Sequence, residues 1–159
     1  MPKLESFVMD SISPELAGLL ESAAMPSLGG GPINLELGHW LQSDGAKDAK
    51  LPPLATCGLW LVCGDLDASH EISQSIETPD GSFWHGIMHR REGDFWNSKY
   101  WFRRVGPHPV LKQLASTDYG DSQAFVDRCE AALASGGVEI QSCESSQWRE
   151  WQLLFKHCL

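Results

Sequence analysis

The sequence predicts a mainly α-helical, single-domain fold, resembling a helical bundle with short irregular segments. Apolar residues recur at spacings of three and four, serine, proline and glycine mark the segment ends, and the connections are short. A chain of 159 residues can bury one sizeable core but not two. We expect an N-terminal helix with flexible connections over residues 1–53, and a helical core over residues 54–159.

The first 53 residues are expected to contain one clear helix. Ser13 is a suitable N-cap, and Pro14 fits the first turn because its missing N–H is not needed there. An apolar stripe follows, and Pro26 with the glycines at 29–31 ends it in a flexible connection. Residues 33–41 read as a short helix or strand, and the polar residues 42–50 as a surface loop.

Residues 54–77 are expected to form one amphipathic helix. Its apolar residues fall on one side, namely Leu59, Val62, Leu66 and Ile76. On the flank of that side lies a polar patch at spacings of three and four, made of Asp67, His70 and Gln74. The patch is either a solvated helix flank or part of a working site.

Residues 77–82 contain turn-forming residues, and the segment 83–92 after them fits a helix or a strand. His85 and His89 share a face under both readings, and a helix adds Glu92 to that face. Two histidines at i and i+4 have the spacing of a transition-metal pair. The H-E-x-x-H signature is absent because Gly86 follows His85.

The rest of the chain is expected to be helical scaffold. Asn97 is expected to cap a short helix that Gly106 ends, and a proline corner leads to the next helix. Asp121 or Ser122 should cap a further helix, and residues 138–140 should be extended. The last helix is expected to start at Ser145 or Ser146.

Residues 80–109 form the candidate site, because cationic, titratable and aromatic side chains concentrate there. Four of the chain's six arginines lie in it: Arg90, Arg91, Arg103 and Arg104. With them we expect the aromatic residues Trp84, Trp96 and Tyr100 to line a pocket. Guanidinium groups bind carboxylate and phosphate, whereas stacking of arginine on aromatic rings is the purely structural alternative.

Composition narrows the class of partner. A net charge of -9 and a pI near 5.0 argue against nucleic acid as the ligand. No stretch approaches the roughly 20 apolar residues of a membrane span, and the N-terminus lacks an apolar signal run. Five cysteines without a C-x-x-C pair fit free thiols. We expect a soluble, cytoplasmic protein.

The run WHGIMHRREGDFWNSKYWFRRVGPHPV, preceded by LDASHEISQ and followed by QWREWQLLFKHC, resembles a family of uncharacterised bacterial and fungal proteins. The resemblance covers residues 54–159 and implies one domain built from these segments. It implies no activity, cofactor or catalytic residue.

Three functions are compatible with these residues. The first is an enzyme for a small anionic substrate, with His70, His85, His89 and Asp67 as catalytic groups and the arginines as an anion clamp. The three histidines would bind a divalent metal ion or act without one as acid and base. The second is a small-ligand binding protein that uses the same pocket. The third is an interaction module that uses the Trp/Tyr/Arg surface.

Overall fold

The computed structural model describes residues 3–159 and confirms the mainly α-helical fold. Eleven helices contain 71% of the described residues, which include no strand. In chain order the helices are α1 (Ser6–Met9), α2 (Pro14–Ser22), α3 (Leu35–Leu41), α4 (Asp44–Ala49), α5 (Pro53–Cys63), α6 (Leu66–Ser73), α7 (Pro79–Glu92), α8 (Phe95–Val105), α9 (Pro109–Leu114), α10 (Ser122–Ser135) and α11 (Val138–Cys158).

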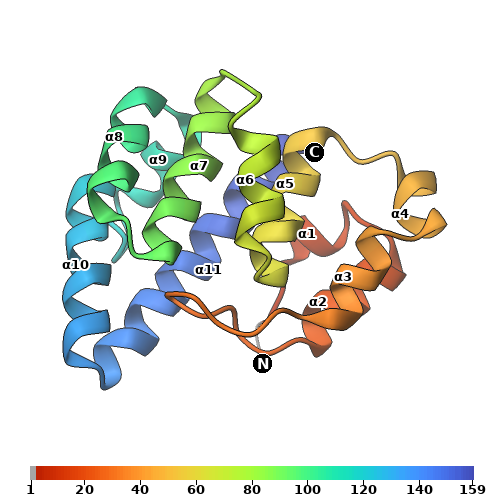
Figure 1. Cartoon of the computed structure of the whole chain (residues 1–159), viewed down its shortest axis with the longest axis horizontal. Helices are drawn as coiled ribbons and strands as arrows, with labels where there is room; N and C mark the ends of the chain where they lie inside the picture. Colours follow the sequence, from red (N-terminus) through yellow and green to blue (C-terminus); the bar gives the residue numbers. More distant parts are fainter. Residues whose placement is uncertain (1–2) are drawn as a thin grey trace.

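Helix α7 is the centre of the arrangement. It packs against α5, α6 and α8, and α11 runs behind these helices, where it contacts α1, α5, α9 and α10 (Figure 1). Every residue of α7 from Gly81 to Arg91 is buried, including two histidines and two arginines. A helix that is buried on all sides must satisfy its polar side chains inside the protein. This explains why the polar clusters of the fold gather around α7.

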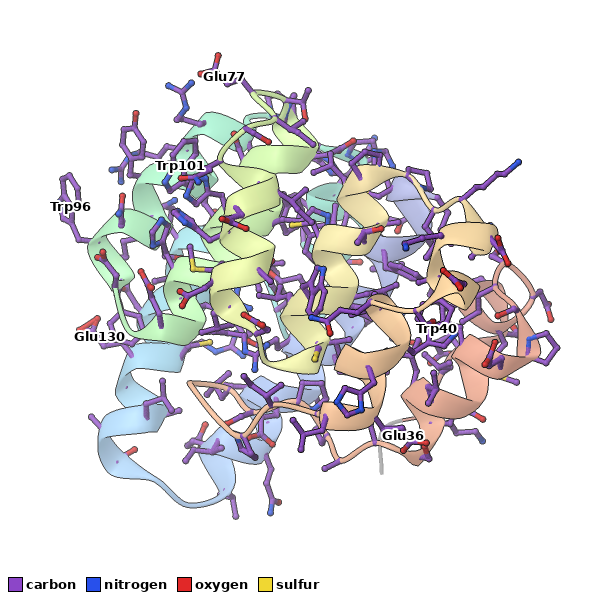
Figure 2. The ribbon with its side chains drawn as sticks, turned by 45° about the vertical axis from the view of Figure 1, so that its right-hand side comes forward. Glu36, Trp40, Glu77, Trp96, Trp101 and Glu130 are labelled. Atoms are coloured by element: carbon purple, nitrogen blue, oxygen red, sulfur yellow. The ribbon has the colours of Figure 1, made fainter. Side chains whose placement is uncertain are left out.

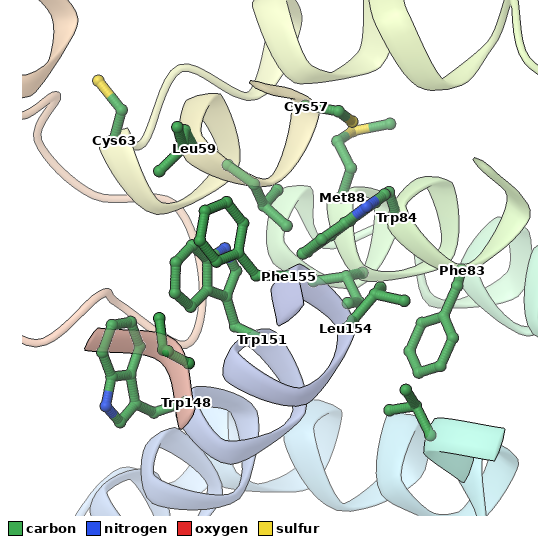
Figure 3. Packing of buried hydrophobic residues seen from close by; sticks show 14 of the residues in the cluster. Cys57, Leu59, Cys63, Phe83, Trp84, Met88, Trp148, Trp151, Leu154 and Phe155 are labelled. Atoms are coloured by element: carbon green, nitrogen blue, oxygen red, sulfur yellow. The ribbon is translucent and has the colours of Figure 1, made fainter. Parts of the chain in front are cut away.

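The core is rich in aromatic rings, many of them from α11. Trp148, Trp151 and Phe155 form a continuous stack with ring centroids 5.0 and 4.7 Å apart, and they belong to the same buried cluster as Leu59 of α5 and Trp84 of α7 (Figure 3). The Trp151 indole N–H donates to the Gly58 carbonyl at 2.7 Å. The stack therefore joins α11 to α5 both by apolar contact and by a hydrogen bond.

The close contact between α7 and α8 depends on Gly86. A Cβ atom at this position would lie 2.9 Å from the Phe102 ring, so only glycine lets the helices come this near. Ser98 Oγ donates to the Gly86 carbonyl at 2.7 Å. This contact brings the aromatic residues of α8 over the histidines of α7.

Residues 54–77 form two helices, not the single helix that the periodicity predicts. Gly64 ends α5 with a φ of 93°, a left-handed conformation that favours glycine. The side chain of Asp65 then caps α6 by accepting from the Ala68 N–H at 3.0 Å. The break turns α6 back against α5 and α7, so that His70 reaches α7.

Several predicted boundaries are also corrected. Residues 79–82 belong to the first turn of α7, whose N-cap is Thr78, and α8 is capped by Asp94 and not by Asn97. Helix α11 begins at Val138, seven or eight residues before the predicted start at Ser145 or Ser146, so residues 138–140 are helical and not extended. The serines at 145 and 146 therefore lie inside the helix, and its buried residues begin at Cys143.

The N-terminal third is more structured than expected. It contains α1 to α4, and residues 42–50, predicted as a loop, include the short helix α4. Side chains of this region enter the common core, among them Leu4, Val8, Leu16, Leu20, Leu28, Leu37 and Trp40. Residues before 54 are therefore part of the same domain and not only a helix with flexible connections.

Candidate functional site

Three imidazoles from two helices meet beside α8. His70 comes from α6, and His85 and His89 come from successive turns of α7. The ring centroid of His70 lies 4.7 Å from that of His85 and 5.5 Å from that of His89. One ring nitrogen from each residue lies within 4.8 Å of the other two. The structure thus brings together the three histidines that the sequence singled out.

His85 is the innermost member of the cluster. Its side chain is 4% exposed and stacks on Trp101 of α8 with ring centroids 3.9 Å apart. Its Nδ1 atom is buried and has no hydrogen-bond partner. Burial, with smaller contributions from His89 and His70, lowers the pKa of His85 to about 3. His85 is therefore a neutral imidazole at physiological pH.

His89 is oriented by a carboxylate. Its Nδ1 lies 2.6 Å from Oε1 of Glu92, one turn further along α7. An Nδ1–H that donates to Glu92 leaves the Nε2 lone pair free, which is the arrangement that carboxylates impose on metal-binding and catalytic histidines. Asp94 places a further carboxylate within 4.8 Å of this pair.

The relative orientation of the rings limits what the cluster can do as it stands. His85 and His89 are stacked, with planes 18° apart and centroids separated by 4.7 Å. Imidazole lone pairs lie in the ring plane, so two stacked rings do not aim them at one point. His70 lies edge-on to both and is half-buried, so the cluster reaches the surface at α6.

Asp67 is not the carboxylate of this cluster. It is exposed on the first turn of α6, and the group of residues with ligand atoms within 4.8 Å of one another contains only His70, His85 and His89. Gln74, the third member of the predicted patch, is also exposed. The break at Gly64 rotates α6 so that His70 faces α7 while its polar neighbours face solvent. Glu92 takes the position expected of Asp67.

The four arginines do not converge in one clamp. Arg90 is fully buried and forms a two-armed ion pair with Glu150 of α11, at 2.6 and 3.1 Å. Burial alone would lower the pKa of Arg90, but Glu150 outweighs it and holds this pKa above its ordinary value. Its Nη2 also donates to Gln147 at 3.0 Å, so Arg90 has no free face for an anion.

Arg91 lies apart from the histidines. It is 4% exposed, donates through Nη1 to the carbonyl of Leu61, and lines two cavities between α5, α7, α11 and the loop before α3. Trp148 and Trp151 border the smaller cavity, not the aromatic residues that the sequence suggested. Of the four predicted arginines, Arg91 is thus the one that lines a described cavity together with tryptophan side chains.

The remaining predicted binding residues separate into surface and core. Arg103 and Arg104 are exposed on α8, and the Arg104 guanidinium lies over Tyr100 and Trp101 at 5.8 and 5.4 Å. Trp96 is 74% exposed, stacks on Tyr100, and projects from the surface in Figure 2. Trp84 is completely buried in the core and cannot contact a ligand. Of these residues, Arg104 and Tyr100 lie near the histidines, because both contact Trp101 and Trp101 stacks on His85.

A second polar cluster, which sequence reasoning missed, joins three helix ends. Asp80 Oδ1 in the first turn of α7 lies 2.6 Å from His108 Nε2 and 3.1 Å from His157 Nε2 near the end of α11. His108 Nδ1 accepts from the Val110 N–H at 3.1 Å and so caps α9. Its proton is therefore on Nε2, which makes this atom a donor to Asp80 and unsuited to bind a metal. The separation of these residues in sequence gave no signal.

The cysteines do not form a nucleophilic site. All five are free thiols, as expected, and four of them are buried. Burial raises the pKa of Cys57 to about 11, so this residue is a neutral thiol at physiological pH.

Comparison of the chain with protein-family models, with curated proteins and with solved structures finds no match. Among the described residues, no helix combines the length and apolarity needed to cross a membrane. The function must therefore be argued from the site itself.

Proposed function

We propose that this chain is a small metal-dependent enzyme that acts on a small anionic substrate. His70, His85 and His89 would hold a divalent transition-metal ion. The observation that carries the proposal is the convergence of three imidazoles, the innermost of which has a buried ring nitrogen without any partner. Buried polar atoms are normally paired, and an unpaired one needs a reason such as a missing ion.

The protonation of the cluster favours a cation. His85 is neutral because burial lowers its pKa to about 3, and Glu92 fixes the proton of His89 on Nδ1. Neutral imidazole nitrogen is a preferred ligand for Zn²⁺ and its neighbours in the first transition series. Three protein ligands leave one position open for water or substrate, which is the pattern of catalytic and not of structural zinc sites.

Binding of an ion requires the rings to turn. A tetrahedral site with Zn–N bonds of about 2.0–2.1 Å needs lone pairs that converge from nitrogens roughly 3.4 Å apart, and the stacked rings of His85 and His89 do not provide this convergence. The terminal torsion of histidine is broad, so His85 and His89 can rotate out of their stack at modest cost. Such a rotation separates His85 from Trp101, which should change the fluorescence of that indole.

Arg104 supports an anionic substrate. Its exposed guanidinium lies over Trp101, and Trp101 stacks on His85. A cation held beside a metal site attracts anions in a protein whose net charge is otherwise -9. The substrate class is therefore a small anion that approaches across α8.

The test is titration of metal-free protein with Zn²⁺ and Co²⁺, followed by calorimetry and by the visible spectrum of Co²⁺. We expect one ion per chain, with a spectrum typical of nitrogen ligation. His85→Ala should abolish binding, and His39→Ala, which changes an exposed histidine of α3, should leave it intact. Absence of binding, or equal loss in both variants, refutes the metal centre.

A metal-free acid–base pair is the second candidate, and the 2.6 Å contact between His89 and Glu92 favours it. Glu92 would fix the tautomer of His89 so that Nε2 acts as the base. Hydrolysis of p-nitrophenyl phosphate and p-nitrophenyl acetate before and after chelation separates the two candidates. Turnover that survives removal of metal but is lost in His89→Gln supports the metal-free pair.

A further inference from the structure

Arg91 is a buried cation on the side of α7 that faces away from the histidine cluster. It follows His89 by two residues, which places it about 200° further round the helix. Its side chain is 4% exposed and lies among α5, α11 and the loop 23–34. Arg91 therefore belongs to a different part of the molecule from the proposed metal centre.

The guanidinium of Arg91 is incompletely paired. Nη1 donates to the carbonyl of Leu61 at the end of α5, and Nε is buried without a hydrogen-bond partner. Within residues 3–159, the described ion pairs include no carboxylate bonded to Arg91. Arginine stays protonated in proteins, so Arg91 is a buried cation.

The neighbouring Arg90 shows how a carboxylate neutralises a buried guanidinium in this fold, although its Nε, like that of Arg91, has no hydrogen-bond partner. Arg90 has both arms on Glu150 and a further bond to Gln147. Arg91 has only a carbonyl, although burial of an unpaired charge is costly. The carboxylate of Glu144 borders the smaller of the two cavities beside Arg91, and one of its oxygens accepts the backbone N–H of Leu28 at 3.3 Å. Glu144 therefore attracts Arg91 only from a distance, and no carboxylate of the described ion pairs is bonded to its guanidinium.

A cavity of about 310 Å³ lies against this side chain. Its walls are largely apolar, with Met25, Pro26, Ile33 and Val62, and it also contains Ser27 and Asn34. Ligand pockets typically combine apolar walls with a few polar groups that fix orientation. A second, narrower cavity, which shares Pro26, Val62 and Arg91 with the first, has room for about one water molecule.

We propose that this cavity binds a small organic monoanion, with its carboxylate on Arg91 and its apolar body against Met25, Pro26 and Val62. A guanidinium fork matches a carboxylate in shape and charge. A doubly charged phosphate fits less well, because Arg91 is the only cationic residue lining the cavity and Glu36 lines it too. The site is independent of the histidine cluster, so either proposal can fail alone.

The experiment uses the full chain, with benzoate as the probe and amide resonances as the readout. Benzamide has the same shape without the charge, and inorganic phosphate carries the charge without the apolar body. We expect benzoate to shift the amides of Val62, Cys63 and Gly64 in a saturable manner, and at least tenfold weaker binding of the two comparison compounds. No saturable shift, or a preference for phosphate or benzamide, overturns the proposal.

Two substitutions locate the site. Arg91→Met should weaken benzoate binding at least tenfold, whereas Arg149→Met, the same change at an exposed position of α11, should leave it unchanged. If Arg91→Met does not fold, Arg91→Lys keeps the charge but loses the fork and should weaken binding at least fivefold. Unchanged binding in the folded Arg91 variant places benzoate elsewhere and refutes the site.

Discussion

Arg90 and Glu150 face one another at the centre of the protein, where neither side chain is exposed to solvent. Two parallel contacts of 2.6 and 3.1 Å join the guanidinium to the carboxylate, and the Phe125 ring lies 4.7 Å from the guanidinium carbon. The pair ties α7 to α11. It also removes one arginine of the predicted anion clamp from any contact with a ligand.

Glu150→Ala should destabilise the protein strongly, because it leaves the Arg90 charge buried and unpaired. Loss of one partner of a buried ion pair typically costs about 3–5 kcal/mol. The free energy of unfolding from urea titration measures the loss. Glu130→Ala removes an exposed carboxylate from α10 and should change this free energy by less than about 0.5 kcal/mol. Equal stability of the two variants would show that the pair contributes nothing net.

The buried, neutral state of His85 predicts a specific pH dependence of stability. The folded pKa is about 3, below the ordinary value of 6.5, so between these limits the unfolded chain binds a proton that the folded chain does not. The free energy of unfolding should therefore fall as the pH is lowered from 6.5 toward 3, and be independent of this group above 6.5.

The variant His85→Gln isolates this contribution. The slope due to one histidine cannot exceed about 1.4 kcal/mol per pH unit, and it should be absent from the variant. Unfolding by urea at several pH values between about 4 and about 8 gives both curves. Parallel curves for the two proteins would contradict the buried neutral imidazole.

Glu92 should affect metal binding more than stability. It orients His89 but is 40% exposed on its side chain, so Glu92→Gln should change the free energy of unfolding by about 1 kcal/mol or less. Removal of a carboxylate behind a metal-binding histidine typically weakens metal affinity by about 10–100-fold. Calorimetric titration with Zn²⁺ measures the affinity.

Asp67→Asn provides the matched control for Glu92→Gln. Asp67 lies one turn before His70 on α6 but is exposed and outside the cluster, so this substitution should leave the Zn²⁺ affinity unchanged. A loss of affinity in Asp67→Asn together with none in Glu92→Gln would reverse the assignment of the supporting carboxylate.

The pattern of the sequence predicted contacts within one helix better than contacts between helices. His85 and His89 share a face in any regular structure, so their pairing followed from spacing alone. The meeting of His70 with them required the turn at Gly64, and the single predicted helix over residues 54–77 omitted this turn. The meeting of the three histidines was expected because the connection between the two segments is short. The carboxylate assigned to them, Asp67, was wrong.

The arginines are the opposite case, because their closeness in the sequence led to the wrong prediction of one shared anion site. Arg90, Arg91, Arg103 and Arg104 are close in sequence, but they belong to two helices and point to different partners. The partner of Arg90 is Glu150, 60 residues away. One signal was present: Glu150 lies among the apolar residues of the last helix, where an acidic residue needs a buried cation. For the Asp80 cluster no comparable signal existed.

Substitution of Trp96 tests whether the surface pair Trp96 and Tyr100 belongs to the proposed metal site or to a separate interaction surface. Trp96 is 74% exposed and contributes little to the core. Trp96→Ala should therefore change the free energy of unfolding by less than about 0.5 kcal/mol and leave Zn²⁺ binding intact. Loss of metal binding in this variant would mean that the surface pair belongs to the same site.

The cluster of Asp80, His108 and His157 should stabilise the junction of three helix ends. Asp80 accepts from His108 and lies 3.1 Å from Nε2 of His157, and His108 in turn caps α9 through Nδ1. Asp80→Ala leaves the buried Nε2–H of His108 without its acceptor, which should cost about 1–3 kcal/mol. His157 is exposed, so His157→Ala should cost less than about 1 kcal/mol. Amide hydrogen exchange at the start of α9 and the end of α11 should accelerate in Asp80→Ala, because these ends lose their shared anchor. Exchange that is unchanged there would mean that apolar packing alone holds the two ends.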